Sequence, residues 1–320
     1  MLNDTFDNSG FNMVSDISIS KQNIKNIDVR QNELFEIRNA ILSELSYTIC
    51  QDNDASFDTI KKGYDSIFHN PDTQGDNKLK KYLENISVID KISFCRYYSK
   101  SKQSTQEISS MLFGEEEKTP LDIIGKVAYM KNPYTDSAYL IFSKSLTTPR
   151  SSYFSSFQSV CEEVYSGSCE YCILPIESSN DGKLMSFYSM IDKYELKITS
   201  VCTIRHSDNQ KFTKFALLRK SISATGIFNA SPAYLNKRSI EIRVSQTSQA
   251  HSPLDNILFA ANACSLKLQR IDSLPLSYND NLLGYYVVLN ISHTDFKTFL
   301  TYLSLEHPES YIVGIYTSHT

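Results

Sequence analysis

The sequence of 320 residues contains no apolar run close to the roughly 20 residues that a membrane-spanning helix needs. Its first residues, MLNDTFDNSGFNMVSD, are polar and acidic and lack the apolar segment of a secretory signal. Basic residues are not in excess either, since the net charge is -4 and the pI is near 5.9. This balance gives no electrostatic reason to bind nucleic acid or an anionic membrane. We therefore expect a cytoplasmic protein with neither of these partners.

Paired cysteines and paired histidines are also missing. The seven cysteines are odd in number and scattered, which argues against a disulfide framework and fits a reducing compartment. Cys169 and Cys172 form a CxxC, but no second pair and no histidine at zinc-finger spacing accompanies them. We interpret both as thiols of a buried strand. The six histidines show no paired helical spacing, so we expect no metal site and no cofactor.

What is present is the composition of a globular protein, 41% hydrophobic and 21% charged, in a chain long enough for two or three domains. Its periodicity changes along the chain, which predicts a multidomain α+β protein. The expected parts are a disordered tail at 1–19, a helical module at 20–105, a linker at 106–122, a single-lobed α/β domain at 123–235 and a ferredoxin-like domain at 236–320.

The first part has helical periodicity. Apolar residues recur every three to four positions over 34–49, 57–67 and 79–89, which predicts three amphipathic helices. The polar stretch from Ser99 to Pro120 includes Glu115, Glu116 and Glu117 and has the composition of a linker.

The next two parts alternate strands with helices. We expect strands at 126–130, 169–176, 196–204 and 213–220 with helices at 155–167 and 182–195, an order typical of an α/β layer with a largely parallel sheet. From RSIEIRVSQTS to SYIVGIYTS the pattern is βαββαβ within about 80 residues, the ferredoxin-like order.

A strand-to-helix corner, CILPIESSNDGKL, is the most distinctive local sequence. Four polar residues precede the expected helix and are good N-cap candidates: Ser178, Ser179, Asn180 and Asp181. Capping alone explains such residues. A functional alternative is an anion site, because free N–H groups at a helix start attract negative charge.

The same corner resembles the prephenate dehydratase family, whose signature strand ends in a Pro-Ile-Glu-Asn-Ser turn. Two segments follow this corner, LKITSVCTI and FTKF. The family carries Thr-Arg-Phe at the position of FTKF. VAYMKNPYTDSAYL is similar to the family's first strand and Gly-Pro-x-Gly-Thr turn. The βαββαβ segment resembles the ACT regulatory domain that follows the dehydratase, with RIDSLPL where the family has Glu-Ser-Arg-Pro.

The resemblance implies roles for individual residues. Thr213 matches the catalytic threonine, and Lys214 stands in place of the family's arginine. The implied substrate-binding residues are Thr135, Ser137, Glu177, Ser178, Ser179 and Phe215. In the ACT-like part, the implied residues for a regulatory ligand are His251, Leu254, Asp272 and Ser273. Leu274 replaces the arginine of the regulatory motif, and Ser252-Pro253-Leu254 replaces a Gly-Ala-Leu turn, which puts phenylalanine sensing in doubt.

The largest departure from the family lies at RHSDNQKF, residues 205–212. In the family, the chain makes a whole second lobe at this place, and the active site lies in the cleft between the lobes. Eight residues can make a turn but not a lobe. Prephenate has two carboxylates and loses water and carbon dioxide together, which needs fixed cations, a positioned donor and an enclosed site. We expect one wall of the cleft to be missing.

The N-terminal helices have two interpretations. Asn26 to Leu45 is similar to the first helix of the chorismate mutase that precedes the dehydratase in bifunctional proteins of this pathway. Ile41 occupies the place of an arginine there, and Arg38 and Arg96 are further cations. Helices that only pack or dimerise are the simpler interpretation.

These observations predict a divergent dehydratase-like protein of phenylalanine biosynthesis, a pseudoenzyme that acts as a binding or regulatory subunit. One alternative is an active prephenate dehydratase whose cleft is completed by the helical module or a second subunit. Another is an amino-acid sensor acting through the ACT-like module. The expected ligand is a small carboxylate, prephenate or an aromatic amino acid, and we expect a homodimer through the ACT-like domain.

Overall fold

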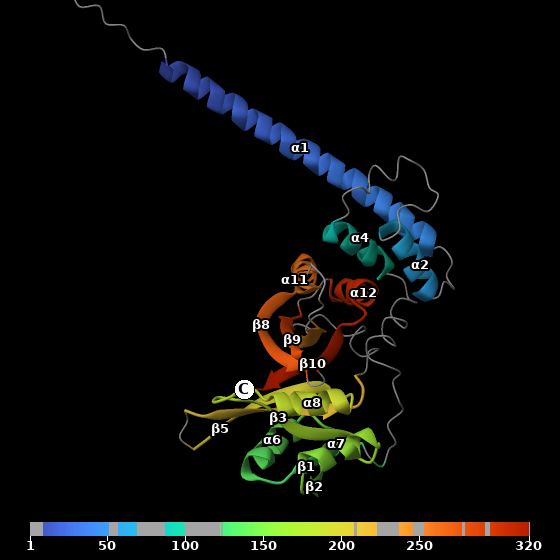
Figure 1. Ribbon diagram of the computed structural model, residues 1–320, viewed down its shortest axis with the longest axis vertical. Helices are drawn as coiled ribbons and strands as arrows, with labels where there is room; N and C mark the ends of the chain where they lie inside the picture. Colours follow the sequence, from blue (N-terminus) through green and yellow to red (C-terminus); the bar gives the residue numbers. More distant parts are fainter. Residues whose placement is uncertain are drawn as a thin grey trace, which may run out of the picture.

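The computed structural model describes residues 9–50, 57–68, 87–99, 122, 124–207, 210–222, 237–245, 253–276, 279–291 and 295–319. Within these ranges the chain forms a ten-stranded mixed sheet with helices on its faces, and a group of N-terminal helices stacked at one end (Figure 1). The strand order is β2-β1-β3-β6-β5-β10-β7-β9-β8, with the short β4 paired to β3. None of the helices in the described ranges is long and apolar enough to cross a membrane.

The α/β part occupies one end of this sheet. Its strands are β1 (Lys126–Met130), β2 (Arg150–Phe154), β3 (Tyr171–Ser178), β4 (Gly182–Lys183), β5 (Lys197–Arg205) and β6 (Phe212–Arg219). Its helices are α6 (Pro133–Ser143), α7 (Phe157–Tyr165) and α8 (Met185–Lys193). One apolar core joins α7 and α8 to one face of the sheet, and a second core joins α6 to the opposite face. Side chains alternate between these faces along each strand.

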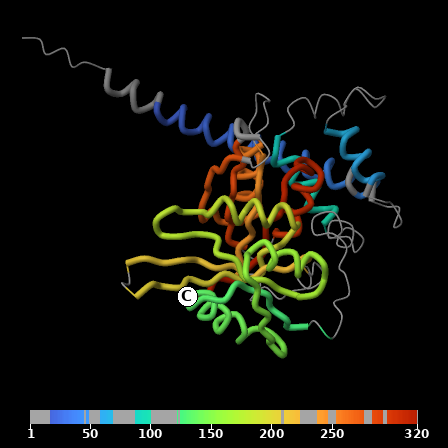
Figure 2. The backbone as a smooth tube through the Cα atoms, turned by 60° about the horizontal axis from the view of Figure 1, so that its bottom comes forward, coloured from blue at the N-terminus to red at the C-terminus, as the bar shows by residue number. Residues whose placement is uncertain are grey.

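The expected parallel arrangement holds only for part of this sheet. β1 pairs in parallel with β2 and β3, but β6 is antiparallel to both β3 and β5. The reason is the short connection between β5 and β6, which must return the chain beside itself. Arg205 pairs with Phe212, and the His206 amide donates to the Lys211 carbonyl at 2.8 Å. Figure 2 shows this hairpin as two neighbouring yellow-orange segments.

The last part has the expected βαββαβ order. Its elements are β7 (Arg238–Ser245), α11 (Pro253–Ala263), β8 (Lys267–Leu276), β9 (Asn279–Asn290), α12 (Phe296–Glu306) and β10 (Tyr311–His319). Their spatial order, β10-β7-β9-β8, is the antiparallel arrangement of a ferredoxin-like fold. Both helices cover one face of these strands, in the same apolar core as the N-terminal helices. The prediction of a ferredoxin-like βαββαβ unit is confirmed.

The two parts share one sheet, which the sequence did not predict. β10, the last strand of the chain, pairs in parallel with β5, and Gly314 lies beside Ile198. The face of the βαββαβ unit that α11 and α12 leave open packs against α8 of the α/β part. There the rings of Tyr188 and Tyr286 lie 4.9 Å apart, and Arg243 forms an ion pair with Asp192. Periodicity shows where strands lie in the sequence but not which distant strands they join.

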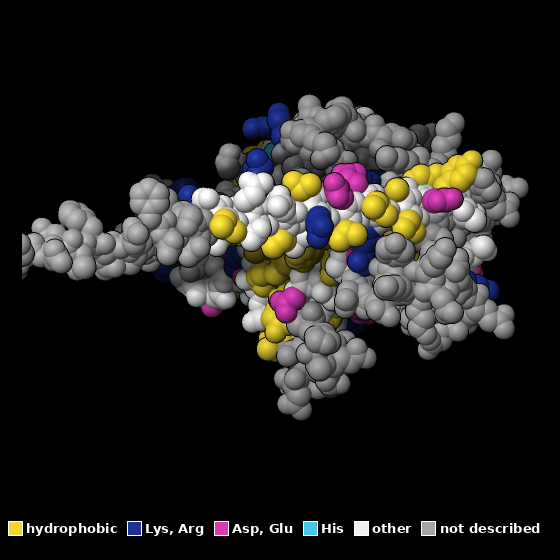
Figure 3. All heavy atoms as spheres, turned by 90° about the horizontal axis from the view of Figure 1, so that it is seen from above, with side chains coloured by type: hydrophobic (Ala, Val, Ile, Leu, Met, Phe, Trp, Pro, Cys, Tyr) yellow, Lys and Arg dark blue, Asp and Glu magenta, His cyan; other side chains and the backbone are white. Residues whose placement is uncertain are grey.

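The N-terminal helices are α1 (Ser9–Cys50), α2 (Phe57–Phe68) and α4 (Val88–Tyr98). α1 and α2 confirm the helices expected at 34–49 and 57–67, whereas most of the helix expected at 79–89 lies outside the described residues and α4 was not predicted. α1 begins at Ser9, so residues 9–19, expected as a disordered tail, are helical. Apolar side chains lie along α1 among charged ones (Figure 3).

α4 begins at a capping box formed by Ser87 and Asp90. It packs on α12, where Lys91 pairs with Glu306, and the end of α1 packs on α4. Residues 100–121, which include all but the last residue of the linker expected at 106–122, lie outside the described ranges.

Lys197 makes the junction between β5 and β10 sensitive to pH. It is 7% exposed, and its Nζ donates to the Ile312 carbonyl at 2.7 Å. Burial lowers the pKa of Lys197 to about 7, although Asp192 and Glu195 act in the opposite direction. In the unfolded chain a lysine has a pKa of about 10.4. The unfolded state therefore binds more protons between these values, and stability rises with pH across that window.

We expect Lys197→Met to remove this rise in stability. The wild type should gain up to about 1.4 kcal/mol per pH unit between about pH 7 and 10 relative to Lys197→Met. Urea unfolding at intervals from pH 7 to 9.5 measures the free energy of unfolding of each variant. Lys267→Met, at an exposed position, is the matched control. Parallel pH profiles for the wild type and Lys197→Met would contradict the prediction.

Candidate functional site

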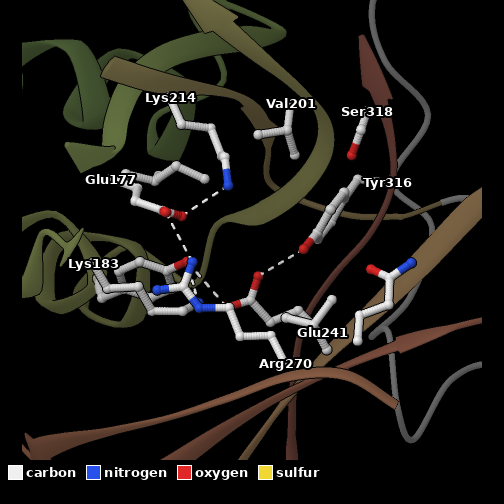
Figure 4. A pocket seen from close by; sticks show the side chains of 12 residues that line it. Glu177, Lys183, Val201, Lys214, Glu241, Arg270, Tyr316 and Ser318 are labelled. Carbon is white, nitrogen blue, oxygen red and sulfur yellow. Dashed lines mark hydrogen bonds and ion pairs between the residues drawn. The ribbon is translucent and has the colours of Figure 1, made fainter. Parts of the chain in front are cut away.

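A pocket lies where the α/β part meets the βαββαβ unit. Its volume is about 270 Å³, close to the lower end of the usual range for small-molecule sites. Strands β3, β4 and β6 supply one side, and β7, β8 and β10 supply the other (Figure 4). Ile176, Val201 and Val288 contribute apolar wall. The pocket therefore depends on the way the two parts of the sheet are joined.

Glu177 stands at the centre of the charged lining. It lies near the end of β3, directly opposite Lys214 on β6. Its Oε2 accepts a hydrogen bond from Lys214 Nζ at 2.8 Å, and its Oε1 accepts one from Arg270 Nη1 at 2.8 Å. Burial would raise the pKa of Glu177, but the hydrogen bonds from Lys214 and Arg270 outweigh it, and the pKa lies below its usual value. Glu177 is thus an anion that links β6 of one part to β8 of the other.

A second carboxylate, Glu241 on β7, is deeper in the pocket and 1% exposed. Its Oε1 accepts hydrogen bonds from Lys183 Nζ and from the Tyr188 hydroxyl, the latter at 3.0 Å. Its Oε2 accepts one from the Tyr316 hydroxyl at 3.1 Å. Burial and the nearby Glu241 charge raise the pKa of Tyr188 and Tyr316 well above the usual value, so both remain neutral donors.

The arrangement is suited to a small anionic molecule. Three cationic side chains, Lys183, Lys214 and Arg270, line the pocket with two carboxylates, Glu177 and Glu241. An ammonium has three donors and a guanidinium has five, so the cations that hold Glu177 can also donate to a ligand carboxylate. Charge-assisted hydrogen bonds of this kind are the stronger ones in proteins.

Comparison with known proteins assigns a family to the segment that carries the α/β part of this pocket. The family model named Prephenate dehydratase matches residues 131–255, from the end of β1 to the first turn of α11. Residues 131–255 of this chain are a prephenate dehydratase-like segment. None of the curated proteins matches the sequence.

Three solved structures show what the chain is similar to at low identity. A protein titled "GqqA- a novel type of quorum quenching acylases" is 15% identical with a TM-score of 0.46, over 61% of this chain and 95% of that one. Prephenate dehydratase from Streptococcus mutans is 16% identical with a TM-score of 0.45, over 61% of this chain and 99% of that one. Prephenate dehydratase from Arthrobacter aurescens, in complex with L-Phe, is 12% identical with a TM-score of 0.44, over 60% of this chain and 89% of that one. All three TM-scores are below 0.5, so the family assignment rests on residues 131–255.

The dehydratase signature turn does not cap a helix here. The hydroxyl of Ser178 donates to Asp181 Oδ2 at 2.8 Å and accepts from the Asp181 amide at 3.0 Å, which closes a turn between β3 and β4. Ser179 exchanges hydrogen bonds with the backbone of Phe212. Helix α8 begins later, and its N-cap Leu184 makes no side-chain cap. The prediction of an N-cap at 178–181 was wrong because β4 pairs with β3 before the helix begins.

Thr213 and Phe215 lie on the other face of the sheet from Lys214. Phe215 is buried in the core under α6, and adjacent residues of a strand point to opposite faces. The Thr213 hydroxyl lies 3.0 Å from His206 Nε2, and the His206 ring stacks on Tyr134 at 4.4 Å. The structure therefore brings Glu177 and Lys214 together in the pocket but not Thr213 or Phe215.

The other two residues of the first family turn serve α6 locally. Thr135 is fully buried, and its hydroxyl donates to the Met130 carbonyl at 2.6 Å within a capping box with Asn132. The Ser137 hydroxyl donates to the Pro133 carbonyl one turn back at 2.8 Å. Neither lines the pocket.

The residues proposed for a regulatory ligand are spread out. Asp272 accepts from Arg270 Nε at 2.7 Å and lies 3.8 Å from Lys183 Nζ, so it is beside the pocket. Ser273 follows it on β8, opposite Tyr285. Leu254 packs on the core beneath α11, and His251 is outside the described residues.

The two cations considered for a mutase are held by carboxylates of this chain. Arg38 Nε lies 2.6 Å from Asp90, and Arg96 Nη2 lies 2.8 Å from Asp295. Metal sites were not expected, and in the part of the chain that the structure describes no group of three or more potential ligands is placed to hold a metal ion. Cys169 and Cys172 are buried and free, as interpreted.

Sequence reasoning missed most of the charged lining. Lys183, Glu241 and Arg270 were not among the candidate residues, nor were Tyr188 and Tyr316. One signal existed, because Glu241 interrupts the apolar strand of Ile240 and Ile242. In a sheet with one open face such a residue faces solvent, and only the packing of α8 on that face buries it.

Proposed function

We propose that this prephenate dehydratase-like protein binds a small carboxylate in the pocket and acts as a binding or regulatory subunit of phenylalanine biosynthesis, with dehydratase activity lost or severely reduced. The observation that carries the proposal is the β5–β6 hairpin, in which strand pairing continues to Arg205 and Phe212. Residues 206–211 leave no length for the second lobe that forms half of the family's cleft.

The charges in the pocket also support binding rather than turnover. Lys214, in place of the family's arginine, donates to Glu177, so its charge is partly used inside the protein. A lysine is a point charge and lacks the bidentate fork with which arginine holds a carboxylate. A ligand carboxylate placed between Lys214 and Arg270 would compete with Glu177 for the same donors. Such a ligand would then alter the link between β3 and β8, and this gives regulation a physical basis.

The proposal is tested by calorimetric titration of the chain with prephenate, phenylpyruvate and phenylalanine. Removing Arg270 by Arg270→Gln should weaken binding about tenfold or more, because a hydrogen bond to a charged group contributes about 1.5–3 kcal/mol. The exposed Arg150→Gln on β2 is the matched control and should bind like the wild type. No heat with any of the three ligands would remove the proposal, and so would equal affinities for Arg270→Gln and wild type.

An active dehydratase is the second candidate, and one observation favours it. Arg270 and Tyr316 of the βαββαβ unit face Glu177 and Lys214 across the pocket (Figure 4), so this unit supplies a wall that the missing lobe does not. Phenylpyruvate formation from prephenate, measured beside a protein-free blank, separates the candidates. A rate in the ordinary enzyme range that Lys214→Met abolishes would establish the enzyme with its active site in this pocket. A rate equal to the blank supports the binding subunit.

The ACT-like role and the assembly remain part of the proposal. The ferredoxin-like strand order supports an ACT-like module that senses an amino acid, and β8 at the end of the sheet is an edge through which two copies could pair as a homodimer. Cytoplasmic localisation remains a prediction from composition.

A further inference from the structure

The charged side chains in and beside the pocket balance one another. Three cations and three carboxylates lie there: Lys183, Lys214, Arg270, Glu177, Glu241 and Asp272. A ligand with two carboxylates and no positive charge, such as prephenate, would add two negative charges that these groups do not balance. Charges that are removed from water without a partner are unfavourable. A ligand whose own charges sum to zero would keep the balance.

The two carboxylates of the pocket differ in what they can still bind. Glu241 is 1% exposed and is held by Lys183, Tyr188 and Tyr316. The Glu177 side chain is 13% exposed, and each of its oxygens accepts one hydrogen bond from the described residues. A carboxylate oxygen can accept two. Glu177 is therefore the carboxylate that a positive group of a ligand would reach.

The cations that hold Glu177 also have donors left for a ligand. The side chains of Lys214 and Arg270 are 31% and 39% exposed, against 5% for Lys183. Lys214 uses one of its three donors on Glu177. Arg270 donates through Nε to Asp272 and through Nη1 to Glu177, and its Nη2 makes no hydrogen bond within the described residues. A ligand carboxylate can therefore bind beside Glu177, to Lys214 and to Arg270 Nη2.

The uncharged part of the pocket is suited to one small apolar group. Ile176, Val201 and Val288 form its apolar wall, and the volume of about 270 Å³ leaves room for a small molecule only. Packing an apolar ligand side chain on this wall is favourable because it removes apolar surface from water.

We propose that the pocket recognises an α-amino acid with an apolar side chain as a zwitterion, with the ligand ammonium on Glu177 and the ligand carboxylate on Lys214 and Arg270. This step rests on the proposed function, the binding of a small carboxylate in the pocket, and names the class of that ligand. The two charged groups of an α-amino acid are attached to one carbon atom. The groups that bind them are equally close together, since Lys214 and Arg270 each lie 2.8 Å from Glu177.

Glu177 gives the pocket its selectivity between an amino acid and a plain carboxylate. A ligand carboxylate draws Lys214 and Arg270 away from Glu177. A plain carboxylate would leave the largely buried Glu177 with fewer donors, which is unfavourable. The ammonium of an amino acid replaces those donors. The same molecule without its amino group should therefore bind more weakly.

Calorimetric titration of the wild-type chain with three related molecules tests the recognition of both charges. Phenylalanine carries both, 3-phenylpropionate lacks the ammonium, and 2-phenylethylamine lacks the carboxylate. Each deletion should weaken binding about tenfold or more, because hydrogen bonds to charged groups are among the stronger ones. Binding of 3-phenylpropionate or phenylpyruvate as tight as that of phenylalanine would overturn the zwitterion and leave the proposed function standing. No heat from any of these ligands or from prephenate would remove both.

Glu177→Gln tests which residue binds the ammonium. This variant should weaken phenylalanine binding about tenfold and leave 3-phenylpropionate binding unchanged or tighter, because Lys214 and Arg270 lose their internal competitor. The readout is the ratio of the two affinities, since general damage to the pocket would weaken both ligands together. Glu162→Gln, at an exposed position of α7, is the matched control and should keep the wild-type ratio. An unchanged ratio in Glu177→Gln would overturn the proposal. The wild-type series does not depend on the folding of this variant.

Discussion

Replacing Glu241 with glutamine should lower the free energy of unfolding by about 3–5 kcal/mol, the usual cost of breaking a buried ion pair from one side. Glu241 is 1% exposed and accepts hydrogen bonds from Lys183, Tyr188 and Tyr316. Glutamine keeps the size but removes the charge that neutralises Lys183, which is itself 5% exposed. The remaining carboxylate, Asp272, is 3.8 Å from Lys183 Nζ.

Urea unfolding of a small variant set measures this effect and identifies its cause. Lys183→Met alone should also be destabilising, because it leaves the Glu241 charge buried. The double variant should lose less than the sum of the two single losses, since neither charge is left unpaired. The exposed Glu36→Gln on α1 is the control for the same chemical change. Additive losses in the double variant would show that the pair is not coupled, against the prediction.

The second large effect is expected for Gly314→Ala, where β10 meets β5. A Cβ on Gly314 would lie 2.4 Å from the Ile198 carbonyl oxygen and 2.6 Å from Ile198 Cβ. Backbone cannot move as a flexible side chain can, so the strands must separate locally. We expect a loss of about 3 kcal/mol, at the upper end of the usual cost of overpacking. The substitution acts on the pairing that joins the two parts of the sheet.

Urea unfolding also measures this loss, and hydrogen exchange shows where it occurs. Amides of β5 and β10 near the substitution should exchange faster than in the wild type, whereas those of β1 should change less. Ser318→Ala, at an exposed position of the same strand, is the control. An unfolding midpoint equal to that of the wild type would mean that the junction tolerates a side chain, which the geometry does not allow for.

The elements that sequence predicted best are those whose pattern is local. The βαββαβ order was expected from alternating apolar segments, and β7 to β10 have the predicted types and sequence. At 205–212 the length alone indicated a turn in place of a lobe, and the structure forms a β5–β6 hairpin there. The predicted largely parallel sheet failed at β6, since that same hairpin forces an antiparallel return.

The site was predicted less well, for a physical reason. Glu177 and Lys214 were found through the resemblance to a family, and the structure places them 2.8 Å apart. Ser178 was expected to cap a helix, but β4 intervenes, and two residues are too short a strand for periodicity to show. Arg270 is far from both along the chain and reaches them only through the tertiary fold.

The sequence by itself determined the βαββαβ order of the last part and the dehydratase-like character of residues 131–255, because each is encoded by neighbouring residues. Only the tertiary structure decided that β10 pairs with β5, that Glu241 is buried and that Arg270 meets Glu177. Each of these depends on contacts between segments that are distant in the sequence. The local pattern allows many such contacts, and the packing of α8 and the pairing of the strands decide which of them form.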